Sequence, residues 1–348
     1  MSDVSPSLGG APRRSGLTRA GAVFAALAGL VCLMVGDLIT GPAGLPLSKV
    51  LTGIAAGPSG DDKGLATILW LLRMPQTLTA VLVGACLGVA GLMMQTILAN
   101  PLASPYTLGF SAAAGFGAAS VILFGSALPV AMWLGVPLAA FAGTLVAAGL
   151  VYVVAKYRGS SPEILVLAGI AVLFFFQSLQ SMLQFMAAPE VLQQIVFWLF
   201  GSLLKATWTS VKVISVLFAL CLPFLLRDAW NLTSLRLGDS NAASLGLDVD
   251  ALRRRTLVIV AVLTAAAVSF TGTIGFVGLI APHVARALIG EDHRFSLPMS
   301  AIMGAIVLVA ASVVGKLISP GAVIPVGIIT AIAGIPMLVG VIMMKGTR

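Results

Sequence analysis

Charged residues are scarce in this chain of 348 residues: Asp, Glu, Lys and Arg make up 9% of it, while apolar residues make up 59%. Soluble domains carry about 25% charged residues, so the composition excludes a soluble globular protein. The mean hydropathy of +1.08 and the long apolar runs instead indicate an all-α polytopic membrane protein, because a bilayer is crossed by helices of about 20 apolar residues.

Cysteine and histidine are also rare. The 3 cysteines, Cys32, Cys86 and Cys221, lie in apolar runs without CxxC spacing, so neither a disulfide framework nor a metal site is expected. We expect all three to be buried small apolar residues. Of the 2 histidines, His283 lies in an apolar run and His293 in a charged turn. We expect His283 to be structural, and His293 to fix its turn or to touch a soluble partner.

Catalytic motifs are missing as well. The stretch at 57–64, GPSGDDKG, lacks the spacing of a phosphate-binding loop, GxxxxGK followed by Ser or Thr. Acidic residues are nearly absent from the apolar runs, since Asp37 lies at the end of one run and Glu163 in a turn. An enzyme with its own ATPase motif is therefore not expected, and an ion-coupled carrier working alone is disfavoured.

The apolar runs predict about ten transmembrane helices. These form a single domain, 17–348, behind a disordered cytoplasmic N-terminus, 1–16. A short interfacial helix is expected over 189–204. The predicted spans cover 20–40, 73–98, 106–124, 128–154, 164–186, 208–226, 256–271, 274–289, 297–318 and 325–344.

Basic residues give the orientation of these spans. If the chain crosses the membrane ten times, the clusters of basic residues at 13–19, 156–158, 227–255 and 345–348 lie on one face of the membrane. Cytoplasmic loops carry an excess of Lys and Arg. Both termini and the 227–255 stretch are therefore expected in the cytoplasm.

The stretch 227–255 is the longest interruption of the apolar runs. It holds 5 arginines, 4 aspartates and two Leu-Gly pairs, which we interpret as two short helices broken at glycines. Its charges and broken backbone would be unsatisfied in hydrocarbon. We expect it to form a platform in water for a soluble partner.

One predicted span carries a polar face. Gln177, Gln180, Ser181 and Gln184 recur at helical spacing and share one side of the helix. Glutamines facing lipid would be costly, so this side points at protein or water. Hydrogen bonding between helices and the wall of an aqueous translocation path both remain open interpretations.

Short motifs follow one another from about residue 70 to residue 336. They include RMP at 73–75, NPLA at 100–103, the Leu-Gly pairs at 237–238 and 245–246, GFVGLI at 275–280, PH at 282–283, DHR at 292–294 and PVG at 325–327. In this order they resemble the FecCD family of ABC importer permeases. That family imports ferric siderophores, cobalamin and haem.

The resemblance implies a type II ABC importer permease in a bacterial or archaeal cytoplasmic membrane. It implies a homodimer with the path along the twofold axis, and separate ATPase subunits that bind ATP and Mg²⁺, so that this chain binds no cofactor or metal. The implied ATPase-coupling residues are Arg236, Leu237, Gly238, Ala242, Leu245 and Gly246.

The resemblance also implies a periplasmic or lipid-anchored binding protein on the outer face, met here by Arg73 and Lys316. A cytoplasmic gate is implied at Ser161, Pro162 and Glu163. The chain departs from the family pattern at Lys316, usually arginine, and at Ser312, usually aspartate.

The leading hypothesis is the permease subunit of an ATP-driven importer of a ferric siderophore or similar metal chelate. The alternative is a cobalamin or haem importer of the same architecture, and a remote alternative is an ion-coupled secondary carrier. Uptake by the chain without any ATPase would favour the carrier.

Overall fold

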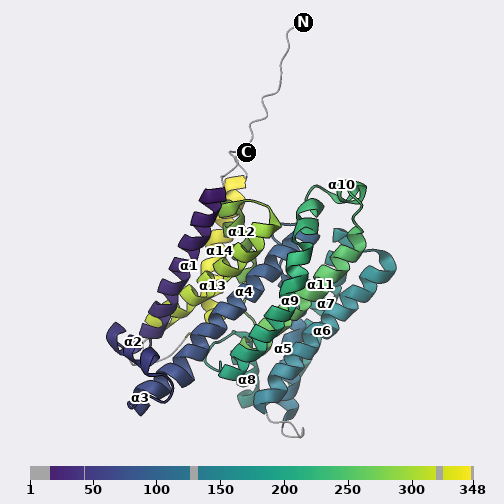
Figure 1. Cartoon of the computed structure of the whole chain (residues 1–348). Helices are drawn as coiled ribbons and strands as arrows, with labels where there is room; N and C mark the ends of the chain where they lie inside the picture. Colours follow the sequence, from purple (N-terminus) through teal and green to yellow (C-terminus); the bar gives the residue numbers. More distant parts are fainter. Residues whose placement is uncertain (1–15, 43, 126–131, 319–323, 346–348) are drawn as a thin grey trace.

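The computed structural model describes residues 16–42, 44–125, 132–318 and 324–345. Within these ranges the chain forms helices and turns, with no strand. The predicted disordered segment 1–16 lies outside the described residues except for Gly16, which begins the first helix. Figure 1 shows a helical bundle with α10 at one end and α2, α3 and α8 at the other. We call these the α10 end and the α8 end.

Ten helices match the ten predicted spans. They are α1 (Gly16–Ile39), α4 (Met74–Ile97), α5 (Phe110–Phe124), α6 (Met132–Arg158), α7 (Pro162–Met186), α9 (Trp208–Leu235), α11 (Val249–Thr271), α12 (Val277–Ile289), α13 (His293–Ile318) and α14 (Val326–Lys345). Seven helices of the described residues are long and apolar enough to cross a membrane, whereas α5, α12 and the apolar part of α14 are shorter. The all-α polytopic fold is confirmed.

Short elements connect the spans. At the α8 end lie α2 (Leu47–Ala56), α3 (Lys63–Ala66) and the π-helical turn η1 (Thr67–Arg73), which leads into α4. The 3-10 turn η2 (Pro105–Leu108) precedes α5. The predicted interfacial helix is α8 (Pro189–Leu199), and α10 (Asp239–Ser244) lies between α9 and α11.

The interpretation of 227–255 as two short helices is wrong. Residues up to Leu235 continue α9, α11 begins at Val249, and α10 is the one helix between them. The charges that suggested a loop are satisfied within the bundle: Arg255 Nη2 donates to Asp228 Oδ1 at 2.6 Å, and Asp228 is fully buried. A buried charge is tolerated when it is paired in this way.

Helix α4 forms the centre of the bundle, with 18 of its 24 residues buried. Its glycines allow backbone contact with neighbours, because a Cβ at Gly88 would lie 2.2 Å from Ser300 O and one at Gly91 would lie 1.9 Å from Gly278 O. Small residues let helices approach closely in this way. Helices α12 and α13 are therefore locked onto α4.

The link between α11 and α12 is irregular backbone within the bundle. Phe276 adopts φ +66°, a left-handed conformation that a side chain disfavours. The polar groups of this link find protein partners: Thr273 Oγ1 donates to Leu199 O at 2.5 Å, and Ser202 N donates to Thr271 O at 2.7 Å. Non-helical backbone at membrane depth requires such satisfaction inside protein.

The cysteine prediction holds for two of three residues. Cys86 and Cys221 are buried, but Cys32 is exposed. Cys32 lies on α1, which packs chiefly on α13 and leaves its other side open. The prediction of burial was wrong for Cys32 because an apolar run does not tell which side of a helix faces its neighbours.

Candidate docking and translocation sites

The segment between α9 and α11 forms the tip of the α10 end (Figure 1). Leu237 and Leu245 flank α10 and are 63% and 64% exposed, while Ala242 between them is fully buried. Two large apolar side chains held outside a polar loop make this turn a candidate docking site for another protein. We call residues 236–248 the coupling loop, after the role that the family resemblance implies for them.

Two glycines shape this loop. Gly238 has φ +97° and Gly246 has φ +82°, a region in which glycine is favoured because it lacks a Cβ. Gly238 O accepts from Ala242 N at 3.0 Å, and Ala242 O accepts from Leu247 N at 3.2 Å. The predicted coupling residues therefore form one compact, hydrogen-bonded turn.

Arg253 fixes the coupling loop to the bundle. Its guanidinium donates to both carboxylate oxygens of Asp239 at 2.7 and 2.8 Å, and its Nε donates to Ile97 O at 3.0 Å. The Arg253 side chain is 3% exposed. A bidentate pair of this kind is among the stronger polar contacts in proteins. The sequence contained Arg253 in a run of three arginines, but nothing in that run singled it out.

A pocket lies beside the coupling loop. Its volume is about 270 Å³, and it is lined by Gln95, Thr96, Ala99, Asn100, Pro101, Leu235, Arg236, Gly238, Asp239, Arg253 and Arg286. Arg286 Nη2 donates to Gln95 Oε1 at 2.5 Å. Arg236 forms an ion pair with Glu291, and burial lowers the pKa of Arg236 from its usual value. The pocket is thus polar and rich in arginine.

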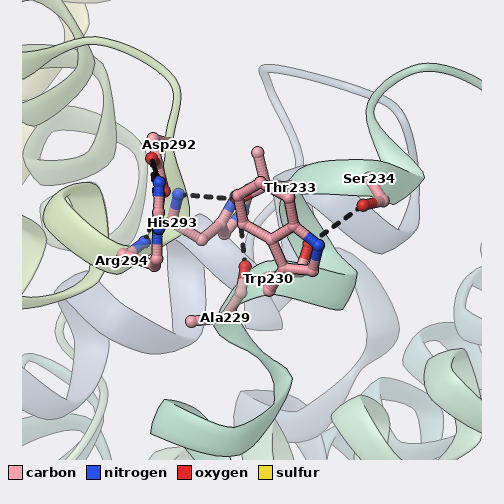
Figure 2. Close-up of polar contacts among 7 residues, drawn as sticks. All are labelled: Ala229, Trp230, Thr233, Ser234, Asp292, His293 and Arg294. Atoms are coloured by element: carbon pink, nitrogen blue, oxygen red, sulfur yellow. Dashed lines mark hydrogen bonds and ion pairs between the residues drawn. The ribbon is translucent and has the colours of Figure 1, made fainter.

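His293 connects three helices next to this pocket. Its Nε2 lies 2.7 Å from Thr96 Oγ1 on α4 and its Nδ1 lies 3.3 Å from Thr233 Oγ1 on α9. Figure 2 shows His293 directed at Thr233, whose hydroxyl also donates to Ala229 O at 2.9 Å. His293 is fully buried, so its side chain fixes the start of α13, as one of the two sequence interpretations predicted.

Arg294, by contrast, lies at the surface. Its Nη2 donates to Asp292 Oδ2 at 2.7 Å, and its guanidinium lies 4.7 Å from the ring centroid of Trp230. Figure 2 draws these three side chains. Hydrogen bonds from Arg294 lower the pKa of Asp292 from its usual value. The cation–π contact between Arg294 and Trp230 ties the start of α13 to α9.

The predicted gate residues form the start of α7. Ser161 is the residue before the helix, Pro162 is its first residue and Glu163 lies in its first turn, where a negative charge is favourable. The neighbouring Ser160 is fully buried, and its backbone N donates to Asp250 Oδ1 on α11 at 3.1 Å. This turn is therefore joined to the helix that carries Arg253, a connection that the sequence did not reveal.

The four residues of the predicted translocation path do not share one environment. Gln177 and Ser181 are exposed, whereas Gln180 and Gln184 are half-buried. Gln180 lies against α5, since a Cβ at Gly115 would be 2.4 Å from Gln180 Oε1. The first pair suits a path wall and the second suits contacts between helices, so both interpretations stay predictions.

The two residues predicted to meet a binding protein are buried at the α8 end. The Lys316 side chain is 7% exposed, and its Nζ donates to Asp37 Oδ1 at 2.7 Å. Arg73 is 6% exposed, and its Nη1 donates to Leu38 O at 2.5 Å and to Ile39 O at 3.0 Å. Their contacts hold α1 to α4 and α13, and their docking role stays a prediction.

Asp37 is the centre of this cluster. It is fully buried and accepts hydrogen bonds from Thr77 Oγ1 at 2.6 Å and Ser312 Oγ at 2.7 Å, in addition to Lys316. The family resemblance implies an aspartate at position 312. Here α1 supplies the carboxylate instead, and Ser312 donates to it. The sequence showed Asp37 only as a charge at a helix end.

Metal ligands do not gather in the described part of the chain. Within residues 16–42, 44–125, 132–318 and 324–345, no group of three or more His, Cys, Asp or Glu side chains could hold a metal ion. In the polar clusters described above, single carboxylates such as Asp37 and Asp239 are paired with arginine, lysine or hydroxyl groups. Such groups bind anions and carboxylates.

Comparisons with known proteins agree with this arrangement. Residues 19–345 match the model of the FecCD transport family. The cobalamin import system permease protein BtuC of Halobacterium salinarum is 38% identical over 295 residues, covering 84% of this chain and 78% of the relative. The Fe(3+) dicitrate transport system permease protein FecD of Escherichia coli is 38% identical over 272 residues, covering 78% and 84%.

A solved structure has the same fold. It is described as an inward-facing conformation of an ABC transporter of metal-chelate type, and it is 31% identical to this chain with a TM-score of 0.82. The match covers 94% of this chain and 99% of the other. The likeness therefore extends over the whole bundle.

Proposed function

Because the chain belongs to the FecCD transport family, we propose that it is the permease subunit of an ATP-driven importer for a ferric siderophore or similar metal chelate. The ferric dicitrate permease among its relatives supports an iron chelate as cargo. The cobalamin permease is equally identical to this chain, so a cobalamin importer is the second candidate. In both, the chain provides the membrane path and a separate subunit hydrolyses ATP.

The observation that carries this proposal is the coupling loop. Leu237 and Leu245 project from a turn that Arg253 ties to α11 and to the end of α4. An ATPase subunit docked on the two leucines moves this turn when it binds ATP. Because the turn is fixed to the central helix, that motion reaches the bundle and rocks the helices between inward and outward access.

A second copy of the chain completes the path. The outer side of α7 carries exposed apolar residues, with Phe174 62% and Phe185 91% exposed, beside the exposed polar residues Gln177 and Ser181. A mixed surface of this kind suits a protein neighbour and water better than lipid alone. In the proposed homodimer, Gln177 and Ser181 line the path near the twofold axis.

The proposed orientation places the α10 end in the cytoplasm, as the distribution of basic residues predicts. The α8 end then faces outward and meets a periplasmic or lipid-anchored binding protein. Since Arg73 and Lys316 are buried, they support that surface from beneath by holding α1 in place. Asp61, Asp62 and Lys63 of the outer loop are exposed at this end.

The test is uptake into vesicles that hold this chain with its ATPase and binding protein. Labelled ferric siderophores, cobalamin and haem are compared with and without ATP. ATP-dependent uptake of a ferric siderophore is the expected result, and uptake of cobalamin or haem alone would replace the cargo. Uptake that does not depend on ATP would contradict the proposal.

Two variants test the coupling loop in the same vesicles. Gly238→Ala strains the backbone at φ +97°, and its new Cβ would have no atom within 4 Å outside the neighbouring residues. Arg236→Glu reverses the charge at the first residue of the loop. We expect both to leave ATP hydrolysis in place while uptake falls at least about 10-fold, as for a lost coupling of 1.4 kcal/mol or more. Unchanged coupled uptake in both would contradict the docking assignment.

A further inference from the structure

We propose that the pocket beside the coupling loop receives one carboxylate side chain of the ATPase subunit, bound by Arg286 and Arg236. This rests on the proposed function, because it names a contact within the docking of that subunit. The pocket volume of about 270 Å³ far exceeds the roughly 10–15 Å³ that a single water needs. An Asp or Glu side chain and a few waters fit into it.

The charge of the pocket is not balanced by its own residues. Its lining contains three arginines and a single carboxylate, Asp239. Asp239 is occupied by Arg253 through two hydrogen bonds of 2.7 and 2.8 Å. Arg236 is paired with Glu291, which lies outside the lining. Arg286 is the arginine of the lining for which no carboxylate partner is present among the described residues.

Arg286 is the better of the two to bind a partner. Arg236 has Glu291 beside it, but no ion pair joins Arg286 to a carboxylate among the described residues. The side-chain partner of Arg286 is the neutral Gln95, whose Oε1 accepts from Nη2 at 2.5 Å. A guanidinium presents five N–H donors, so Arg286 can offer further donors to a carboxylate.

The guanidinium of Arg286 is also positioned before any partner arrives. Gln95 belongs to α4 and is nearly buried, and its Nε2 lies 3.5 Å from Gly278 O on α12. One amide thus bridges the central helix and the helix that carries Arg286. A side chain held in its binding conformation loses less entropy when it binds.

The ATPase subunit is the occupant that the surroundings favour. Arg236, Gly238 and Asp239 of the coupling loop are part of the pocket lining, and Leu237 among them is exposed. A protein that covers Leu237 therefore reaches the pocket. A lipid would need apolar walls for its chains, but the lining is mostly polar. A partly desolvated charge pair at such a site sets specificity and the rate of dissociation.

The experiment measures the affinity of the ATPase subunit for the purified permease in nanodiscs. Arg286→Gln removes the charge but keeps polar atoms, and we expect it to weaken binding at least about 10-fold and to reduce the salt dependence of binding. The matched control is Arg158→Gln, the same change at an exposed arginine that ends α6. We expect the control to change affinity less than about 2-fold.

Charge exchange identifies the partner group. Arg286→Glu is combined with Lys substitutions of the acidic residues on the docking face of the ATPase, one at a time. Restored affinity with one of them supports the proposal, and no restoration with any of them overturns it. The unfolding temperature of each variant is measured alone, so a folding defect is separated from a binding defect.

Three further outcomes are decisive. If Arg286→Gln binds the ATPase as the unchanged chain does, the pocket proposal is overturned while the docking on the coupling loop stands. If inorganic phosphate stabilises the permease through Arg286 and ATPase affinity is unchanged, the site binds a free anion and the proposal is also overturned. Failure of the unchanged permease to bind any ATPase would instead contradict the proposed function itself.

Discussion

The bundle has a charged cluster near each end, and the two are built differently. At the α8 end, Asp37 is fully buried and accepts from Lys316, Thr77 and Ser312. At the α10 end, the arginine-rich pocket contains a single carboxylate. In the first cluster, residues of this chain supply the partners of the buried carboxylate. In the second, N–H donors of Arg286 have no carboxylate partner among the described residues.

The different pairing of charges in the two clusters indicates that they have different roles. A buried charge pair with all its partners in one chain holds helices in place, as Asp37 does for α1, α4 and α13. Arg286 is half-buried and hydrogen-bonded to the neutral Gln95, so a carboxylate of another molecule can pair with it. The α8-end cluster therefore suits a structural role, and the proposed recognition role belongs to the α10-end pocket.

The same two helices serve both clusters. Helix α4 contributes Thr77 to one cluster and Gln95 to the other. Helix α13 contributes Lys316 to the first cluster and carries His293 next to the pocket. Backbone contacts such as that at Gly88 lock the two helices together along their length. In the proposed mechanism, motion imposed at the α10 end would pass along these two helices as a rigid-body displacement.

The largest expected effect comes from opening the closed cluster. Asp37→Asn leaves Lys316 buried without a counter-charge, so we expect the free energy of unfolding to fall by about 3–5 kcal/mol. Thermal unfolding of the purified protein in detergent measures this. Ser312→Ala, which removes one hydrogen bond to the same carboxylate, should cost about 1 kcal/mol. The double variant Asp37→Asn, Lys316→Met should recover part of the loss, and no recovery would contradict the ion-pair interpretation.

A smaller effect is expected where the α10-end cluster is internally paired. Arg253→Gln removes the bidentate pair with Asp239, but Asp239 is half exposed and becomes hydrated. We expect a loss of about 1.5–3 kcal/mol, typical of hydrogen bonds to charged groups. Hydrogen exchange of the backbone amides at 238–247 should become faster. Arg254→Gln, the adjacent substitution, is the control, and equal exchange in both variants would refute the anchoring role of Arg253.

Substitution of His293 tests the connection of α13 to α4 and α9 next to the pocket. His293→Ala removes the contacts to Thr96 and Thr233 and leaves a small cavity, so we expect a loss of about 1–3 kcal/mol. Thr233→Ser keeps the hydroxyl and should be close to neutral. Thermal unfolding of both variants gives the comparison. A stable His293→Ala protein would show that the start of α13 is fixed by Arg294 instead.

The smallest effect on stability is expected at Arg286. Arg286→Gln leaves no buried carboxylate without a partner, so the free energy of unfolding should change by less than about 1 kcal/mol. The same thermal unfolding measurement applies. A loss as large as that of Asp37→Asn would mean that Arg286 is structural, and the contrast between the two clusters would disappear.

Sequence patterns predicted the helices well and the ends of helices poorly. The ten apolar runs correspond to ten helices, because the hydrocarbon thickness fixes their length and composition. Residues 227–235 and 249–255 were assigned to a loop because of their charges. They are helical because partners such as Asp228 and Arg255 neutralise one another across α9 and α11, which no local pattern reveals.

The candidate sites divide in the same way. The family resemblance implies a docking loop at the glycines 238 and 246 and the leucines beside them, and the structure shows these residues in an exposed turn. Arg253, Gln95 and Arg286 were not among the predicted site residues. They come from three different helices and meet at the pocket beside the turn.

The sequence by itself determined that this chain is a membrane-spanning helical bundle with one polar platform, since composition and hydropathy follow directly from the bilayer as solvent. Only the tertiary structure decided which charged side chains are paired within the chain and which are left without a partner of opposite charge. Asp37 and Lys316 are separated by most of the chain, yet their side chains meet at 2.7 Å. Pairing depends on distances in space, and a sequence gives only distances along the chain.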